Sequence, residues 1–221
     1  MVTTGQPKST SVKTESFDAI AQTTCQSVPD YPLQVDEATG AFVNSKFVIC
    51  GGRPTTSNCY TLSRNETAWK PSGNLVTPRE AAASVEINNK LVIFGGYNAG
   101  YLQSTEKFDG DNGISKAGTN MPWAIGYHCA VKVNETTALI IGGYGSSILR
   151  STYFYNANLK IFIPGPLLNV GRSGHGCSIL NTGTERFVIV SGGYTTLGGY
   201  RRLDSTEVMD LKQPTMWKAG L

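Results

Sequence analysis

The chain has 221 residues with a formal net charge of +3; charged residues make up only 16%, and 25 positions are glycine. This length suits one domain with a sizeable core, and low charge with many turn residues is typical of all-β proteins built from short strands. The basic residues are dispersed except for Arg201 and Arg202, which argues against nucleic acid or an anionic membrane as the partner. No apolar run approaches the ~20 residues of a membrane-spanning helix.

The N-terminal segment, residues 1–12, contains Thr, Ser, Lys, Gly and Pro and almost nothing to bury, so it is predicted to be disordered. It also lacks the apolar stretch of a signal peptide, so a secreted form would need a signal upstream. Residues 14–18, Thr-Glu-Ser-Phe-Asp, then begin a strand pattern that recurs further along the chain.

The dominant pattern of the chain is an apolar run closed by two glycines. It occurs four times, and the first glycines lie 44, 47 and 50 residues apart. The glycine pairs are Gly51 and Gly52, Gly95 and Gly96, Gly142 and Gly143, and Gly192 and Gly193. A period of this size indicates a propeller or a solenoid. The glycines suit tight strand exits where a Cβ would clash or φ must be positive, so a structural role is predicted for them.

Each glycine pair is followed by a second recurring strand and then by an aromatic position. Ser-Thr-Glu strands stand at 104–109 and 205–210, with a related strand at 151–156 and a looser one at 58–62. Trp69, Phe162 and Trp217 fill the aromatic position, and Ile114 replaces it once. We expect Trp69 and Trp217 to be buried, each contacting the next repeat.

These motifs resemble the kelch repeat, in which each unit forms a four-stranded propeller blade. The resemblance implies a kelch-type β-propeller over residues 13–221, with four full blades at about 40–71, 82–116, 128–163 and 175–218. It also implies a partial N-terminal blade at 13–32 and a place within a larger, six-bladed ring, because propellers close to remove exposed sheet edges. More narrowly, the Cys-Gly-Gly and His-x-Cys patterns resemble extracellular kelch-type propellers of invertebrates.

The cysteines and two sequons bear on the compartment. Cys50 and Cys59 flank an eight-residue loop between adjacent antiparallel strands, where a disulfide can form in an oxidising environment. Cys25, Cys129 and Cys177 are not paired by the sequence. Asn65 and Asn134 begin N-x-Thr sequons in predicted hairpin turns and are candidate glycosylation sites. Together these features favour an extracellular, secreted protein, with a cytoplasmic location as the alternative.

Candidate chemistry is sparse. His128-Cys129 and His175-x-Cys177 occupy matching places in consecutive repeats and could bind zinc or copper, but a structural hydrogen bond to the neighbouring blade is the simpler interpretation. A copper oxidase centre on this fold needs more ligands than Tyr127-His128 supplies. No nucleophile elbow, phosphate loop or dinucleotide motif is present. The sequence therefore predicts no enzyme, no metal and no cofactor.

The loops after the glycine pairs are the predicted binding surface, because Tyr and Arg are enriched in interface hot spots and all these loops should share one face. The candidates are Arg53, Tyr97, Tyr101, Tyr144, Arg150, Tyr194, Tyr200, Arg201 and Arg202. Asn74 and Asn169 are expected on the opposite face. The predicted function is a non-catalytic module that binds a protein or a glycan, where the arginine pair would favour acidic groups. The alternatives are an intracellular substrate adaptor for a ubiquitin ligase and a copper-dependent oxidase.

Overall fold

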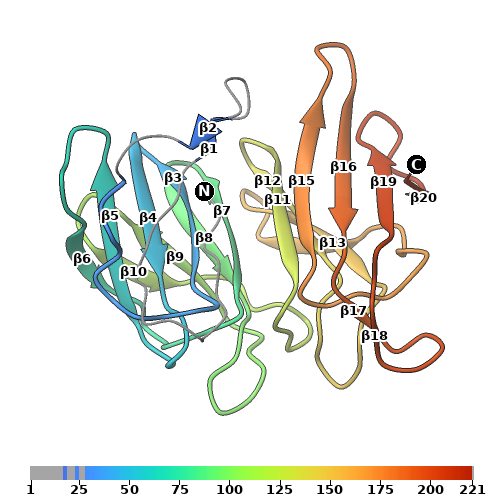
Figure 1. Ribbon diagram of the computed structural model, residues 1–221, viewed down its shortest axis with the longest axis horizontal. Coiled ribbons are helices and arrows are strands. Elements are labelled where there is room, and N and C mark those ends of the chain that lie inside the picture. Colours follow the sequence, from blue (N-terminus) through green and yellow to red (C-terminus); the bar gives the residue numbers. More distant parts are fainter. Residues whose placement is uncertain (1–16, 19–22, 25–27, 221) are drawn as a thin grey trace.

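The computed structural model describes residues 17–18, 23–24 and 28–220. Within these ranges all regular elements are β-strands, and most belong to four antiparallel sheets of four strands each. The described residues contain no helix that could cross a membrane. The all-β propeller architecture predicted from the repeats is thus confirmed, with four sheets standing next to one another in chain order (Figure 1).

The four sheets are called blades A to D. Blade A contains β3 (Thr39–Val43), β4 (Lys46–Cys50), β5 (Asn58–Ser63) and β6 (Lys70–Asn74). Blade B contains β7 (Ala83–Ile87), β8 (Lys90–Phe94), β9 (Thr105–Asp109) and β10 (Ile114–Ala117). Blade C contains β11 (Cys129–Asn134), β12 (Thr137–Ile141), β13 (Thr152–Asn156) and β14 (Ile161–Pro164). Blade D contains β15 (Gly176–Asn181), β16 (Arg186–Ser191), β19 (Thr206–Asp210) and β20 (Lys218–Ala219).

Two small sheets complete the described part. β17 (Tyr194–Thr195) and β18 (Arg201–Arg202) form a hairpin inside the loop that follows the last glycine pair. β1 (Phe17–Asp18) pairs with β2 (Thr23–Thr24). The rest of the predicted partial blade up to residue 27, and the predicted disorder of residues 1–12, lie outside the described residues.

The core lies between blades, because in blades A to C the apolar run before the glycine pair is buried on both faces, and in blade D it is buried on the face towards blade C. Val48 and Cys50 of blade A pack with Leu91, Ile93 and Phe108 of blade B. Equivalent clusters join blade B to blade C and blade C to blade D. This burial on both faces explains why the second strands are continuous apolar runs rather than alternating ones.

The blades are also tied by a chain of backbone hydrogen bonds beside the innermost strands. Ala81 N–H donates to Glu37 C=O at 3.0 Å, Tyr127 N–H to Ala81 C=O at 2.8 Å, and Gly174 N–H to Tyr127 C=O at 2.8 Å. All four residues are left-handed, with φ of 56°, 52°, 54° and 61° from Glu37 to Gly174. Three of the four are not glycine, and a left-handed conformation costs energy for such residues. The repeated interblade bond therefore sets the backbone here.

The loops after the glycine pairs lie on one side of the molecule, which we call the loop face; the turns between the first and second strands lie on the other (Figure 1). The expected position of Asn74 and Asn169 is wrong. Asn74 pairs with Asn58, whose C=O accepts a hydrogen bond from Gly51. Asn169 lies in the blade C to blade D connection, where the neighbouring Leu168 N–H donates to the C=O of Arg150 in the loop after Gly142 and Gly143. Fourth strands end on the loop face because the chain must cross from there to the next first strand.

The two tryptophans are buried, with 6% of Trp69 and 4% of Trp217 exposed. Their expected direction is wrong, because each faces the preceding segment rather than the next blade. Trp69 Nε1 donates to Pro29 C=O at 3.0 Å, and Trp217 Nε1 donates to Pro166 C=O at 3.1 Å. Both prolines precede the tryptophan's own blade, so the indole closes each blade against the chain before it.

Candidate functional site

The four loops that follow the glycine pairs are anchored in the same way. The residue after the glycine pair forms a backbone bridge with a residue just before the first strand of its own blade. The bridges are Asp36 with Arg53, Glu80 with Tyr97, Gly126 with Tyr144, and Ser173 with Tyr194. Four predicted binding residues are therefore held by the scaffold, while the loop beyond each one differs between blades.

The second glycine of each pair makes this bridge possible. In blades B, C and D a Cβ on that glycine would come within 3.0, 2.7 and 2.9 Å of Cβ atoms of Ala82, His128 and His175. The same glycines have φ of 103°, 102° and 87°, where L side chains are strained. The predicted structural role of the glycine pairs matches this crowding.

Arg53 does not present a free guanidinium. Its Nε and Nη2 bind the two Asp36 carboxylate oxygens at 2.9 and 2.6 Å, and its Nη1 lies 3.0 Å from Glu37 Oε1. The side chain is 48% exposed, but its charge is matched by two carboxylates. We call Asp36, Glu37, Arg53, Glu80 and Tyr127 the mouth cluster. The acids and Tyr127 lie just before the innermost strands on the loop face, and Arg53 joins them through its ion pairs.

The mouth cluster contains acids and a phenol in a partly dry setting. Burial raises the pKa of Glu37, opposed by the charge of Arg53. Burial and then the Glu37 carboxylate raise the pKa of Tyr127 to about 12. Glu80 is 7% exposed and accepts a hydrogen bond from Thr55 Oγ1 at 2.5 Å. The raised pKa values mean that Glu37 and Tyr127 hold their protons more strongly than free side chains do, a property that the sequence did not indicate.

Three predicted binding tyrosines pack against one another instead of standing free. The rings of Tyr97 and Tyr101 lie 5.3 Å apart, and those of Tyr101 and Tyr144 lie 5.5 Å apart. Burial, then the two neighbouring phenols, raise the pKa of Tyr101. All three rings are half-buried, so this group both supports the loops of blades B and C and shows one edge to solvent.

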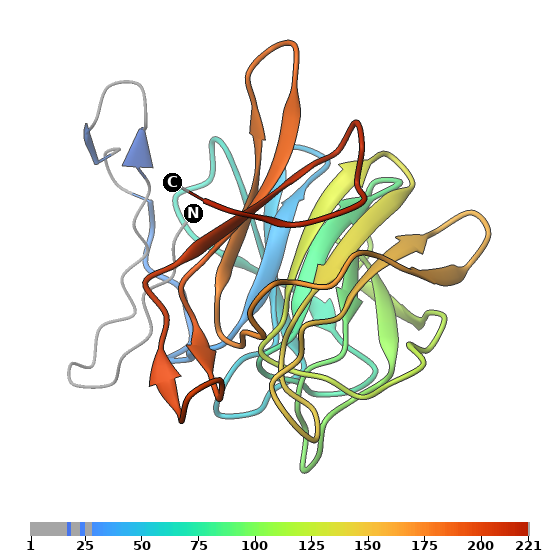
Figure 2. The ribbon, with the colours of Figure 1, turned by 90° about the vertical axis from the view of Figure 1, so that its right-hand side faces the viewer.

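The β17–β18 hairpin of blade D projects from the body of the molecule (Figure 2). Tyr200 is 74% exposed and stacks on Tyr194 with 5.4 Å between ring centroids. The Arg202 guanidinium lies 5.9 Å from the Tyr194 centroid. Arg201 donates to Leu197 C=O at 3.4 Å, and among the described residues neither arginine has a carboxylate partner.

Arg150 belongs to neither group. Its Nε donates to Leu168 C=O at 2.6 Å, so it fastens the blade C loop to the connection towards blade D. The nine predicted residues therefore divide into the clamped Arg53, the tyrosine group, the structural Arg150 and the exposed hairpin.

The structure contains two buried ion pairs that the sequence analysis did not predict. Arg79 binds Glu106 and Arg172 binds Glu207, and all four side chains are at most 3% exposed. Both arginines also donate to backbone carbonyls, and both glutamates accept backbone N–H groups of the preceding connection. The available signal was the joint occurrence of Arg with Ser-Thr-Glu in the same repeats.

Blade C replaces this ion pair with apolar groups. Ile125 takes the arginine position, since Gly96 N–H donates to its C=O just as Gly143 N–H donates to that of Arg172. Tyr153 takes the glutamate position opposite Ile140, and its ring packs at a tilt of 35° against that of Trp123, with 3.6 Å between centroids. The two solutions are thus alternatives at one site of the fold.

The histidines and cysteines do not assemble a metal centre in the described part of the chain. His128 and His175 are buried, and burial lowers their pKa to about 4 and about 3. The Sγ atoms of Cys129 and Cys177, which the sequence left unpaired, lie at disulfide distance and join the first strands of blades C and D. Those of Cys50 and Cys59, the predicted pair, are 2.03 Å apart.

The candidate glycosylation sites lie away from the loop face. Asn65 lies in the turn between β5 and β6, and Asn134 ends β11. Both side chains are exposed. Asn134 Oδ1 accepts hydrogen bonds from the N–H and hydroxyl of Thr136. A glycan at either position would leave the loop face uncovered.

Comparison with known proteins supports the repeat assignment. The family model of the Kelch motif matches residues 78–122. N-acetylneuraminate epimerase of Salmonella typhi is 29% identical over 137 residues, which are 55% of this chain and 35% of the relative. Kelch-like protein 23 of Mus musculus is 32% identical over 92 residues, or 40% of this chain and 16% of the relative. The chain thus spans about a third or less of these relatives.

A likeness to a solved structure extends further along the chain. The structure of YjhT superimposes with a TM-score of 0.72 over 88% of this chain and 67% of that one, at 17% identity. This likeness concerns the fold.

One prediction from the sequence is overturned by the relatives. The absence of familiar catalytic motifs led to the expectation that the chain is not an enzyme, yet several similar proteins are named as N-acetylneuraminate epimerases. Motif absence was a poor guide because a propeller can assemble its polar groups from different blades, as the mouth cluster does.

Proposed function

We propose, since this chain is a kelch-repeat β-propeller, that it is a binding module whose β17–β18 hairpin recognises a carboxylate-bearing glycan on the loop face. The observation that carries this proposal is the pair of unmatched guanidinium groups, Arg201 and Arg202, beside the stacked rings of Tyr194 and Tyr200. Among the described residues neither hairpin arginine has a carboxylate partner, whereas Arg53 on the same face is bound by Asp36 and Glu37.

The chemistry of the hairpin fits an acidic sugar. Guanidinium groups bind carboxylates through paired hydrogen bonds, and the exposed Tyr200 ring offers a flat apolar surface for the C–H face of a sugar ring. Leu197, 61% exposed, extends this apolar surface. The epimerase relatives are named for N-acetylneuraminate, a sugar with a carboxylate, which supports this ligand class.

Saturation-transfer NMR with the full chain tests the proposal. We expect 3′-sialyllactose to receive saturation from the protein, while lactose, which lacks the carboxylate, receives little. Equal transfer to both sugars, or none to either, would contradict recognition of the carboxylate. A peptide partner would then be the better explanation of the exposed hairpin, in line with the substrate-adaptor alternative that the sequence left open.

A second candidate function is proton transfer at the mouth cluster. Glu37 and Tyr127 lie together with raised pKa values, and a carboxylate beside a phenol is a usable acid and base pair. The Glu37 carboxylate would accept a proton and the neutral Tyr127 hydroxyl would donate one. Arg53, fixed by Asp36, would hold the acids in place.

NMR of N-acetylneuraminate incubated with the protein tests this second candidate. We expect interconversion of its isomers to be faster than in buffer and to fall by at least about tenfold in Glu37→Gln. The matched control is Glu135→Gln, an exposed carboxylate in a turn away from the loop face. A rate equal to that of buffer would remove the catalytic candidate and leave glycan binding standing.

We further propose an extracellular location for the chain. Two cysteine pairs at disulfide distance and two exposed sequons support it. Peptide mapping of protein secreted with a supplied signal should find all four of these cysteines protected from alkylation and glycans on Asn65 and Asn134. Free thiols in that material would contradict this location.

A further inference from the structure

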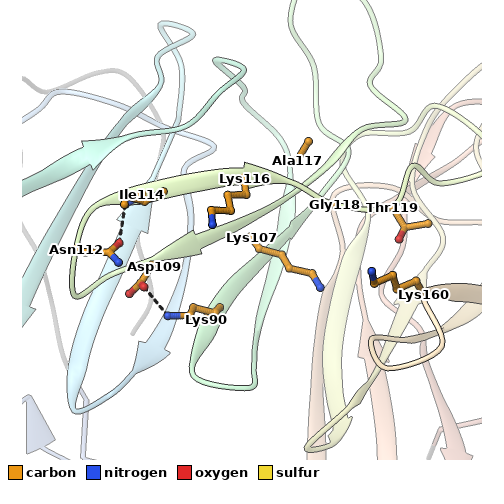
Figure 3. Close-up of a pocket in the computed structure, with 10 residues that line it drawn as sticks. All are labelled: Lys90, Lys107, Asp109, Asn112, Ile114, Lys116, Ala117, Gly118, Thr119 and Lys160. Atoms are coloured by element: carbon orange, nitrogen blue, oxygen red, sulfur yellow. Dashed lines mark hydrogen bonds and ion pairs between the residues drawn. The ribbon is translucent and has the colours of Figure 1, made fainter.

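A hollow lies between the outer strands of blade B and the turn between β13 and β14 of blade C, away from the β17–β18 hairpin (Figure 3). Its volume is about 560 Å³, within the ~300–1,000 Å³ typical of small-ligand sites. We call it the lysine groove, because four of its ten lining residues are lysines: Lys90, Lys107, Lys116 and Lys160. Asp109 is the one carboxylate among these lining residues.

The charges in the groove are unbalanced. Lys90 is paired with Asp109 at 2.5 Å, which leaves three positive charges. In the part of the chain that the structure describes, none of the other three lysines, Lys107, Lys116 and Lys160, has a carboxylate partner. Three lysines outside the groove, Lys46, Lys70 and Lys132, do have acidic partners.

The strand register makes the imbalance costly. Lys107 of β9 stands directly opposite Lys116 of β10, and like charges directly opposite in a ladder destabilise a sheet. Lys107 is half-buried, so solvent screens this repulsion only in part. An anion bound between the lysines would remove that cost.

The third lysine comes from another blade. Lys160 lies in the turn between β13 and β14 with a left-handed φ of 57°, and its ammonium group points across the groove towards that of Lys107 (Figure 3). The three charges therefore surround the hollow from two blades. Ile114, Ala117 and Thr119 supply a mixed apolar and polar wall.

We propose that the lysine groove binds a multiply charged sulfate or phosphate ester of about disaccharide size. Lysine ammonium groups act as compact point charges that suit tetrahedral oxyanions. The size of the hollow and three unmatched charges favour a ligand with two or more such groups rather than a single inorganic ion. This site is independent of the β17–β18 hairpin and of the mouth cluster.

Calorimetry with the full chain tests the proposal with two probes, a trisulfated heparin disaccharide and inositol hexakisphosphate. We expect saturable one-to-one binding of at least one probe, at least about tenfold weaker in Lys107→Gln/Lys160→Gln. The control Lys70→Gln/Lys218→Gln removes the same charge from exposed strands outside the groove, and should change affinity by less than about twofold. The probe that binds more tightly identifies a sulfated glycan or a phosphate ester as the source.

An equal loss in both double variants would mean attraction by net charge alone and would overturn the site. The site would also be overturned if neither probe showed saturable binding. A melting temperature within about 2 °C of wild type, as for a surface change, excludes unfolding as the cause of any loss.

Discussion

The loops after the glycine pairs of blades A and D carry the same residue type in opposite situations. In blade A, Arg53 is clamped by Asp36 and Glu37 at 2.6 to 3.0 Å. In blade D, Arg201 and Arg202 project from the β17–β18 hairpin, and neither has an acidic partner among the described residues. Both loops leave the same kind of backbone bridge, so the scaffold does not cause the difference.

The difference shows that an arginine's place in the repeat does not determine its role. An arginine bound by acids of the same chain has a structural role, whereas one without an acidic partner can bind a ligand. The tyrosines follow the same division: Tyr97 and Tyr144 pack around Tyr101, whereas Tyr200 is 74% exposed. Blade D also contains a fully buried structural arginine, Arg172, which is paired with Glu207. The comparison can be sharpened by removing one arginine of each kind.

The largest effect is expected for a buried arginine. Arg79→Ala should lower the free energy of unfolding by about 3–5 kcal/mol, because the Glu106 carboxylate would remain buried and unpaired. Chemical denaturation measures this. The double variant Arg79→Ile/Glu106→Tyr, which copies Ile125 and Tyr153 of blade C, should lose less than the single variant Arg79→Ile. A larger loss would mean that the two solutions are not interchangeable.

Blades C and D should also differ from blades A and B in their response to acid. Burial lowers the pKa of His128 to about 4 and of His175 to about 3, against about 6.5 in an unfolded chain. Below pH ~6.5 the unfolded chain therefore binds protons that the folded chain does not, and stability falls with pH until the folded pKa values are reached. The loss is at most about 1.4 kcal/mol per pH unit for each histidine.

Alanine provides the control for the histidines, since Ala82 fills the equivalent place in blade B. His128→Ala should flatten the dependence of unfolding free energy on pH between about 6.5 and 4, whatever it does to the absolute value. An unchanged slope would show that His128 does not stay neutral in the folded state.

The smallest effect is expected at Arg53. Because its side chain is 48% exposed, Arg53→Ala should lower stability by less than about 1 kcal/mol and leave binding of sialylated sugars unchanged. Loss of sugar binding in this variant would move the recognition site from the hairpin to the mouth cluster.

The fold was readable from the sequence because its signal is repeated. Glycine pairs mark strand exits where a side chain has no room. Because the motif occurs four times, a wrong assignment of one copy would not have changed the predicted repeat. Even the buried pair of Arg79 and Glu106 was visible as a correlation, because one of the two repeats that lack the glutamate, the one with the strand at 151–156, has Ile125 in place of arginine.

The functional surface was less readable because it depends on contacts between blades. Nothing local in the sequence distinguishes Arg53 from Arg201, since the acids that bind Arg53 lie 17 and 16 residues earlier in the chain. Lys107 and Lys160 come from different blades, as do Glu37 and Tyr127. Such neighbours follow from the left-handed connections and from the strand register, which only the three-dimensional arrangement provides.

The most direct test of the account is the affinity of Arg201→Ala/Arg202→Ala for 3′-sialyllactose beside that of Arg53→Ala. The account predicts that the double variant loses about 2 kcal/mol of binding free energy, roughly a 30-fold change in Kd, with its melting temperature unchanged. It predicts wild-type affinity for Arg53→Ala. Unchanged affinity in the double variant would contradict recognition by the β17–β18 hairpin.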